Sequence, residues 1–343
     1  MSRDRRVVVK LGGDALASPE RIATEARRLV ELAAEHEVLA VVSARRGVTD
    51  HLLGLVEGVR SGVGGSTPGH AEADRAVAAG EVVTAALLAF ALNELGVEAV
   101  SLDARQAGVR AAGGSGEARI RSIEAVRIHR LLDRRVVPVV TGFQGWHRGR
   151  VATLGRGGTD TSAIALAVAI GAGRAIFVKD ADGLRTADPK LVPDSQPLTA
   201  VSHGFLSAMT AAGAKVVHPD AARLAEAHQL PLEFRTLTGP GAATVVRAGT
   251  PTTGLRAIAT HVGSSPASQV TAVAAEPAEA VELVDDLRAA LVSAGVALRD
   301  IQPAANGPRF VVDRDQAGPA TRALHAAFIR AGSAKPDGAR RAS

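Results

Sequence analysis

The segment TLGRGGTDTSAIALAVAI, residues 153–170, places an arginine, paired glycines and an aspartate directly ahead of a long apolar run. Glycine lets backbone N–H groups approach a ligand closely, and a helix begins with unpaired N–H donors at the positive end of its dipole. The segment therefore predicts an anion-binding site. Thr159 and Asp160 are also good N-cap residues, so a capped core helix without a ligand is the alternative interpretation.

The segment VVVKLGGDAL, residues 7–16, offers related chemistry, because an apolar strand-like run reaches Lys10 and is followed by Gly12 and Gly13. A lysine can deliver charge to phosphate oxygens while glycine amides bind them. The GxxxxGK[ST] phosphate-loop pattern is absent from the sequence, and a tight turn is the alternative interpretation.

Lysine is rare in this chain, where arginine supplies most of the 40 basic residues. The lysines are Lys10, Lys179, Lys190, Lys215 and Lys335, and all but the last lie in segments marked by glycine or aspartate. A compact ammonium group suits phosphate oxygens, so this placement favours a phosphate site.

Two further segments combine a lysine with turn-forming residues. VKDADGLRTADPKLVPD, residues 178–194, reads as a loop after a strand; it lacks the glutamate of an EF-hand, and an ordinary surface turn is its alternative. AAGAKVVHPDAA, residues 211–222, places Lys215 ahead of a helix that Pro219 opens. His218 has no HxxxH or HExxH partner, which favours a structural histidine over a metal ligand.

Apolar strand-like runs alternate with helical periodicity through most of the chain. The predicted strands cover residues 5–11, 38–44, 97–102, 136–143, 174–180 and 230–237. The predicted helices cover residues 19–36, 76–96, 122–135, 160–172 and 219–229. This alternation predicts an α/β fold with a mostly parallel sheet between helices, and ligands bind such sheets beyond the carboxyl ends of the strands. Glycine-rich residues 61–70 and 107–118 are expected to form surface loops, either lids or connectors.

The pattern changes after residue 250. Residues 268–332 read as βαββα, which predicts a small second domain over residues 251–331 and a disordered polar tail over residues 332–343. Residues 1–250 are expected to form the main domain.

The composition excludes several classes of protein. The net charge of +5 is spread along the chain and only 2% of the residues are aromatic, which argues against a nucleic-acid surface. The sequence contains no uninterrupted apolar run of about eighteen residues, which argues against a membrane span. The N-terminus does not resemble a signal peptide, and cysteine is absent. We therefore expect a soluble cytoplasmic protein.

Taken together, these segments resemble, in order and spacing, the aspartokinases of the amino-acid kinase superfamily. The resemblance covers roughly residues 5–250 and rests on KLGG, VVSARRGVTD, GEVVTAALLAFALNELGVEAVSL, VVPVVTGFQG, TLGRGGTDTSAIALA, DADGLRTADPKLVPD and GAKVVHPDAARLAEAHQLPLEFR. The last four segments are specific to aspartokinases, whereas KLGG is shared more loosely. The resemblance implies the amino-acid kinase fold, with ATP and Mg²⁺ as cofactors and L-aspartate as the acceptor.

The resemblance also implies a role for each matching residue. Lys10 and Asp160 would be the catalytic pair: Lys10 and Mg²⁺ would offset charge on the transferring phosphoryl group, and Asp160 would orient Lys10. The implied substrate-binding residues are Thr49, Glu81, Phe143, Arg156, Gly157 and Thr159. The implied nucleotide-binding residues are Gly12, Gly13, Asp180, Arg185, Lys190 and Lys215. Glu81 would hold the substrate ammonium and Arg156 its α-carboxylate; a solvated charge at a helix start is the alternative for Glu81.

Several positions depart from the family pattern. Asp14 replaces a threonine and could either help to hold a metal or signal a changed acceptor. Lys179 replaces another threonine, and Arg185 replaces a tyrosine that often lies beside the adenine, although an arginine plane can also stack on a base. The acceptor could therefore be another amino acid or an aspartate derivative. A third reading is a non-catalytic effector-binding homologue, which would be expected to lack the catalytic pair.

The C-terminal region resembles a single, reduced ACT domain. Its segment VAAEPAEAVEL lacks the D-x-P-G turn in which such domains usually bind an effector. We expect an aspartate kinase that lysine and threonine do not inhibit, which would suit a dedicated biosynthetic pathway. A homodimer, formed through the small domain or the kinase sheet, is also expected.

Overall fold

The computed structural model describes residues 5–65, 70–179, 183–237, 244–250, 254–263 and 265–333. Contacts divide the chain into two compact units, Met1–Ala181 with Ala227–Ala242, and Asp182–Glu226 with Ala243–Ser343. Residues 182–226 thus join the C-terminal elements, whereas the sequence pattern predicts one domain through residue 250. The predicted domain borders stay predictions.

The first unit is built on a parallel sheet. Its strands run in the order β13 (Leu232–Thr236), β9 (Arg174–Lys179), β1 (Arg6–Leu11), β2 (Glu37–Val42), β6 (Val137–Thr141) and β3 (Ala99–Leu102), and each neighbouring pair is parallel. β2 and β6 are buried at every position, as expected for strands that are covered on both faces. The predicted parallel sheet is confirmed.

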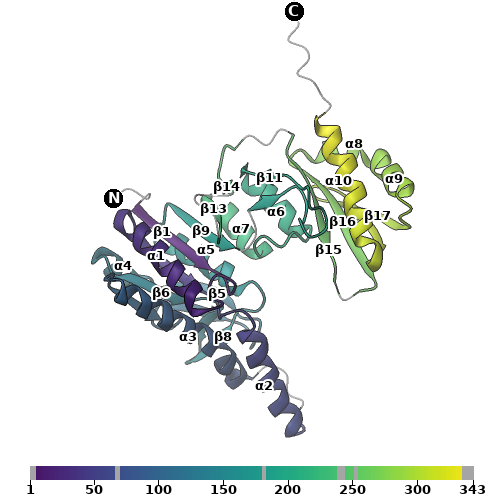
Figure 1. Cartoon of the computed structure of the whole chain (residues 1–343). Coiled ribbons are helices and arrows are strands. Elements are labelled where there is room, and N and C mark those ends of the chain that lie inside the picture. Colours follow the sequence, from purple (N-terminus) through teal and green to yellow (C-terminus); the bar gives the residue numbers. More distant parts are fainter. Residues whose placement is uncertain are drawn as a thin grey trace, which may run out of the picture. The chain divides into compact units, whose positions relative to one another are not determined.

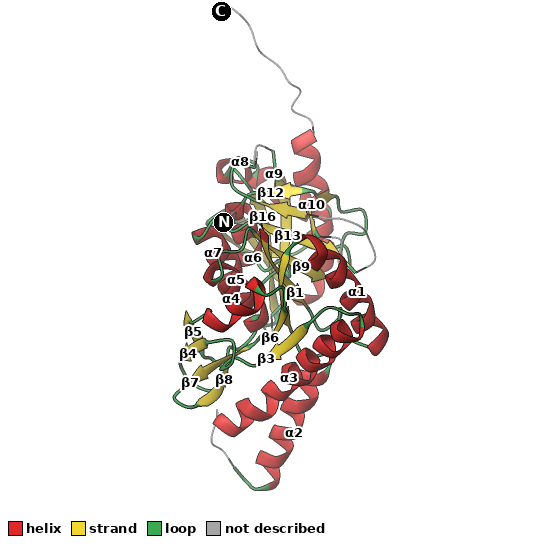
Figure 2. Ribbon diagram, turned by 90° about the vertical axis from the view of Figure 1, so that its left-hand side faces the viewer, coloured by secondary structure: helices red, strands yellow, loops and turns green. Residues whose placement is uncertain are grey.

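Helices cover both faces of this sheet (Figure 2). α1 (Pro19–Glu35) and α3 (Ala71–Glu94) pack against one face, where their apolar residues share a core with alternate residues of β1, β2, β6 and β9. α4 (Val126–Asp133) and α5 (Gly158–Ala169) pack against the other face. Because α5 runs antiparallel to the strands, it begins at the edge where β1, β2 and β6 end.

α3 is long and apolar enough to cross a membrane by length and composition, but half of its apolar window is buried inside the fold. It packs against α1, β3, β6 and β8 (Arg150–Thr153). This packing accounts for the buried apolar residues of α3, whereas Val82, Val83, Leu87 and Phe90 on the same helix are exposed.

Two features of the first unit differ from expectation. The predicted loop 107–118 contains β4 (Val109–Ala112), which joins β5 (Arg119–Ile123), β7 (Gln144–His147) and β8 in a small sheet. Gly113 and Gly116 adopt positive φ angles in the turn between β4 and β5, so these glycines make a hairpin. The start of the predicted helix 122–135 was therefore wrong, because its first residues belong to β5.

α2 (Val48–Gly62) was not predicted, and residues 61 and 62 of the other expected loop belong to it. Residues 66–69 of that loop lie outside the described residues. α2 has no buried residue and lies beside α3 (Figure 2). Val48, Leu52 and Val56 follow helical spacing and are partly buried, whereas the rest of the helix is largely exposed.

The second unit contains an antiparallel sheet in the order β15 (Arg256–His261), β16 (Ala267–Ala274), β18 (Gly307–Asp313) and β17 (Leu298–Ala304) (Figure 1, green to yellow). α8 (Pro277–Glu282), α9 (Val284–Ser293) and α10 (Ala317–Ser333) pack with it. The βαββα order is confirmed, with β15 added and the first helix divided at Leu283. α10 continues past residue 331, where the tail was expected to begin; residues 334–343 lie outside the described residues.

The remaining elements of this unit are short. They are β10 (Leu184–Arg185), β11 (Pro197–Leu198), β12 (Ala200–Val201), α6 (His203–Ala211), α7 (Pro219–Ala227), β14 (Thr244–Val246) and the 3₁₀ helix η2 (Arg314–Gln316). β10 and β11 pair antiparallel and close the loop that connects them.

Candidate active site

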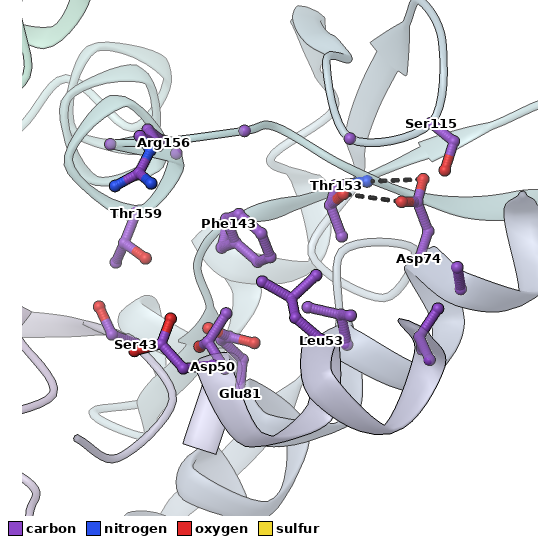
Figure 3. A pocket seen from close by; sticks show the side chains of 18 of the residues that line it. Ser43, Asp50, Leu53, Asp74, Glu81, Ser115, Phe143, Thr153, Arg156 and Thr159 are labelled. Carbon is purple, nitrogen blue, oxygen red and sulfur yellow. Dashed lines mark hydrogen bonds between the residues drawn. The ribbon is translucent and has the colours of Figure 1, made fainter. Parts of the chain in front are cut away.

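A cavity of about 650 Å³ lies in the first unit (Figure 3). Every residue predicted for catalysis or substrate binding lines it: Lys10, Thr49, Glu81, Phe143, Arg156, Gly157, Thr159 and Asp160. These residues come from β1, α2, α3, the segment after β6 and the start of α5. The fold brings them together because these segments meet at the carboxyl edge of the parallel sheet.

A buried ion pair joins Lys10 to Asp160. The Lys10 Nζ and Asp160 Oδ1 atoms are 2.9 Å apart, and both residues are less than 10% exposed. Lys10 lies in the middle of the sheet, in register with Val41 of β2 and Phe177 of β9. Pairing with a strand on each side therefore fixes the position of the Lys10 backbone in the sheet.

The start of α5 places Asp160. The N-cap of this helix is Gly157, in the left-handed conformation and without a side-chain cap, so Thr159 and Asp160 both lie inside the first turn. The alternative interpretation, in which one of them caps the helix, is wrong. An aspartate in the first turn also interacts favourably with the helix dipole.

Close backbone approaches shape the cavity wall. A Cβ placed on Gly142 would lie 2.5 Å from Thr159 Cγ2, so the chain after β6 can approach α5 only with glycine at this position. The next residue, Phe143, has a φ of 64°, which is unusual for an aromatic residue. Such backbone strain concentrates at functional sites, and Phe143 lines the cavity.

A second buried carboxylate supports the loop before α5. Asp74, at the start of α3, accepts hydrogen bonds from the Thr153 backbone N–H (3.1 Å) and hydroxyl (2.8 Å), as Figure 3 shows. Asp74 is 5% exposed. These bonds fix the end of β8, and hence the first residues of the GRGG turn, to α3.

Glu81 is the most unusual titratable group of the site. Its Oε1 atom accepts a hydrogen bond from the Ala44 N–H at 2.9 Å, whereas its Oε2 atom is buried and has no hydrogen-bond partner among the described residues. Removal of the carboxylate from water raises the pKa of Glu81 from 4.5 to about 7, and the bond from Ala44 opposes this shift. The solvated-charge alternative for Glu81 is wrong, because only 2% of the residue is exposed.

Asp14 lies beside a cation. Its Oδ1 atom is 2.9 Å from Arg46 Nη1, and its backbone carbonyl accepts a hydrogen bond from Arg21 at 2.7 Å. The adjacent Gly13 packs tightly, since a Cβ at this position would lie 2.8 Å from the Ala44 carbonyl oxygen. The extra negative charge of Asp14 is therefore offset within the protein.

The residues predicted to bind the nucleotide are divided. Gly12 and Gly13 follow β1, and a Cβ on Gly12 would lie 3.5 Å from Lys10 Nζ. Arg185, Lys190 and Lys215 belong to the second unit. Asp180 lies outside the described residues. The nucleotide roles of all these residues stay predictions.

No group of three His, Cys, Asp or Glu side chains is arranged to hold a metal ion in the part of the chain that the structure describes. His218 accepts a hydrogen bond from the Asp220 N–H at 3.3 Å, at the start of α7, in agreement with a structural role.

Some lining residues were not predicted: Ser43, Asp50, Asp74, Ser115 and Thr153. Ser43 and Asp50 lie within a family-like segment and could have been selected from it. The Asp74–Thr153 contact spans 79 positions and matches no local motif, so only the folded structure reveals it.

A parallel sheet between helices, with a charged cavity at its carboxyl edge, defines an α/β protein whose cavity suits a small polar ligand. The family model for the amino acid kinase family matches residues 5–235. The chain therefore belongs to the amino acid kinase family.

Comparisons with individual proteins point in the same direction. The chain is 38% identical over 232 residues to an aspartokinase of Geobacillus stearothermophilus, covering 67% of this chain and 56% of the relative. It is 37% identical over 242 residues to aspartokinase 2 of Bacillus subtilis, covering 70% and 58%. The matched region is thus little more than half of these relatives. A crystal structure of E. coli aspartokinase III with aspartate and ADP has the same fold (TM-score 0.81, 20% identity, covering 93% of this chain and 99% of that chain).

The raised pKa of Glu81 predicts that replacing this residue with glutamine stabilises the protein above neutral pH. A carboxyl group whose pKa is higher in the folded state contributes stability below the unfolded pKa of about 4.5 and loses it as the pH rises through about 7. Glu81→Gln should therefore raise the free energy of unfolding at pH 8, by up to about 3 kcal/mol, and change it little near pH 4.5. Urea denaturation at the two pH values measures this difference. Glu31→Gln, on an exposed position of α1, is the control; a destabilised Glu81→Gln protein at pH 8 would contradict the prediction.

Proposed function

We propose that this protein is an ATP-dependent kinase that phosphorylates the side-chain carboxylate of L-aspartate to give 4-phospho-L-aspartate. The observation that carries the proposal is the buried Lys10–Asp160 ion pair at the wall of a cavity that also contains Glu81 and Arg156. Family membership and the named aspartokinase relatives support it.

The cavity offers a charge for each end of an amino acid. The unpartnered Oε2 atom of Glu81 is a ready acceptor for a substrate ammonium group, which would also repay the desolvation of this carboxylate. Arg156 is exposed at the cavity wall and can pair with the α-carboxylate. Held at both ends, the substrate would direct its side-chain carboxylate towards Lys10.

The reaction needs little chemistry from the protein. An oxygen of the acceptor carboxylate, already ionised near neutral pH, forms a bond to the γ-phosphorus of ATP, and the bond from that phosphorus to the β,γ-bridging oxygen breaks, leaving its electron pair on ADP. The acceptor does not have to be deprotonated, so catalysis depends on alignment of the two substrates and on stabilisation of the charge on the transferring phosphoryl group. Lys10 would offset the charge of the transferring group, and Asp160 would hold the ammonium of Lys10 in position.

The nucleotide-binding roles rest on the resemblance to aspartokinases. The backbone around Gly12 and Gly13 would approach the phosphates, and Asp180, Arg185, Lys190 and Lys215 would bind the rest of the nucleotide. Mg²⁺, when bound, would neutralise part of the phosphate charge. A phosphate-bound Mg²⁺ needs few protein ligands, which fits a site without a carboxylate cluster among its described residues.

A kinase of a different amino acid is the second candidate, motivated by Asp14 and Lys179. The ion pair between Asp14 and Arg46 weakens this candidate, because it leaves little net charge at that position. Retention of the Lys10–Asp160 pair opposes a non-catalytic role.

An acceptor panel tests the proposal directly. The purified protein with MgATP should release ADP and form a hydroxamate, after trapping with hydroxylamine, with L-aspartate but not with L-glutamate, L-asparagine or N-acetyl-L-aspartate. Lys10→Met and Asp160→Asn should each lower kcat at least about 10²-fold, because each removes a preorganised charge.

Arg174→Met is the matched control. It breaks another ion pair of the same sheet, with 2.9 Å between Arg174 Nε and Glu233 Oε1, outside the cavity. It should keep kcat within about 2-fold even where it lowers stability. Turnover with another acceptor alone would favour the second candidate, and turnover that survives Lys10→Met would contradict the assigned role of the pair.

We also propose that lysine and threonine do not inhibit the enzyme, as suits a kinase of a dedicated pathway; a homodimer stays a prediction. The segment between β16 and α8, Ala275–Glu276, offers neither the aspartate nor the glycine of a D-x-P-G turn. Initial rates should be unchanged by millimolar lysine, threonine or both, and a steep fall in rate on adding either amino acid would refute this proposal.

A further inference from the structure

The loop that is predicted to bind the nucleotide is built into the core of the C-terminal sheet domain. Ala187 and Val192, in the loop between β10 and β11, are buried in one hydrophobic cluster with Phe310 of β18 and Leu324 and Phe328 of α10. Of the predicted ligands, Arg185 is the last residue of β10, directly before this loop, and Lys190 lies within it. All of these residues belong to the second unit.

Thr186 is the polar centre of this arrangement. Its backbone N–H donates to the Gln196 carbonyl at 2.9 Å, and its carbonyl accepts from the Ile258 N–H of β15 at 2.7 Å. Its hydroxyl oxygen accepts from the Gln196 N–H at 2.9 Å and lies 2.8 Å from His325 Nε2 on α10. One side chain thus connects both arms of the loop to a helix that begins more than a hundred residues later.

The protonation of His325 suits this contact. Burial lowers the pKa of His325, and the Asp194 carboxylate opposes this shift. The ring is therefore neutral near pH 7, and its Nε2 atom can accept a hydrogen bond from the Thr186 hydroxyl. In this arrangement the Thr186 hydroxyl donates to His325 and accepts from Gln196, so both partners are satisfied within a buried site.

We propose that His325 is a positioning residue for nucleotide binding, which acts through Thr186 to hold the loop that carries Arg185 and Lys190. The C-terminal domain then serves the catalytic cycle directly, as the support of the nucleotide loop, whether or not it binds an effector. This inference rests on the proposed kinase function.

Steady-state kinetics of matched variants separate this role from a general effect on stability. Thr186→Val removes the hydroxyl at nearly constant shape, and His325→Leu removes its partner. Each should raise the KM for ATP about 10-fold, the equivalent of about one net hydrogen bond, and leave kcat and the KM for aspartate within about 2-fold. Thr186→Ser keeps the hydroxyl, and His325→Gln keeps a group that can accept a hydrogen bond from it. Both variants should therefore have a KM for ATP close to that of the wild-type protein. The double variant Thr186→Val/His325→Leu should be no worse than the worse single variant.

Thr260→Val is the matched control. Thr260 makes the same type of contact to α10, with 2.8 Å between its hydroxyl and that of Thr321, but it lies on β15, outside the loop. It should lower the thermal midpoint about as much as Thr186→Val and leave the KM for ATP unchanged. Calorimetric titration with MgADP gives the same comparison without turnover.

The outcomes distinguish this inference from the function itself. If the wild-type protein transfers phosphate and Thr186→Val or His325→Leu binds ATP as tightly as Thr260→Val, the positioning role is wrong and the kinase function stands. An equal loss of ATP affinity in Thr260→Val would also overturn the role, because it would reduce the effect to stability. A wild-type protein without turnover on any acceptor would instead contradict the proposed function, and MgADP titration would still test the loop.

Discussion

The site depends on one requirement, that two buried charges lie within hydrogen-bond distance of one another. Lys10 and Asp160 are 150 positions apart in sequence, and an isolated charge in their surroundings would cost several kcal/mol. The parallel sheet meets this requirement: β1 holds the lysine between β2 and β9, and α5 returns antiparallel so that its first turn reaches the same edge. An ion pair of this kind adds little net stability, and the catalytic role that we propose for it gives a reason for its position.

The residues around the Lys10–Asp160 pair fix the segments that carry it. Gly142 allows the chain after β6 to touch Thr159, and Asp74 fixes the end of β8 through two hydrogen bonds to Thr153. Glu81 has the opposite character, because its buried and half-satisfied carboxylate lowers stability at neutral pH. A buried carboxylate oxygen without a hydrogen-bond partner is a favourable site for a cationic group. Binding sites often keep such groups although they lower the stability of the free protein.

The parts of the structure that follow from sequence are those with a strong local pattern. The strands and main helices of the first unit could be predicted because strands such as β2 and β6 are almost entirely apolar and alternate with longer segments of helical pattern. The small sheet of β4, β5, β7 and β8 could not, since its strands are short, rich in arginine and alanine, and stabilised by pairing between distant segments. The same reason hides Asp74 and the Thr186–His325 contact: each joins residues far apart in sequence, and no periodicity or motif signals them.

In the proposed function, the cavity orients an amino acid between Glu81 and Lys10. A crystal structure with L-aspartate and MgADP tests it most directly. We expect the substrate nitrogen within about 3 Å of Glu81 Oε2, as for a charge-assisted hydrogen bond, and the side-chain carboxylate directed towards Lys10. Aspartate bound in the reverse orientation, with its α-carboxylate at Lys10, or bound outside this cavity, would contradict it.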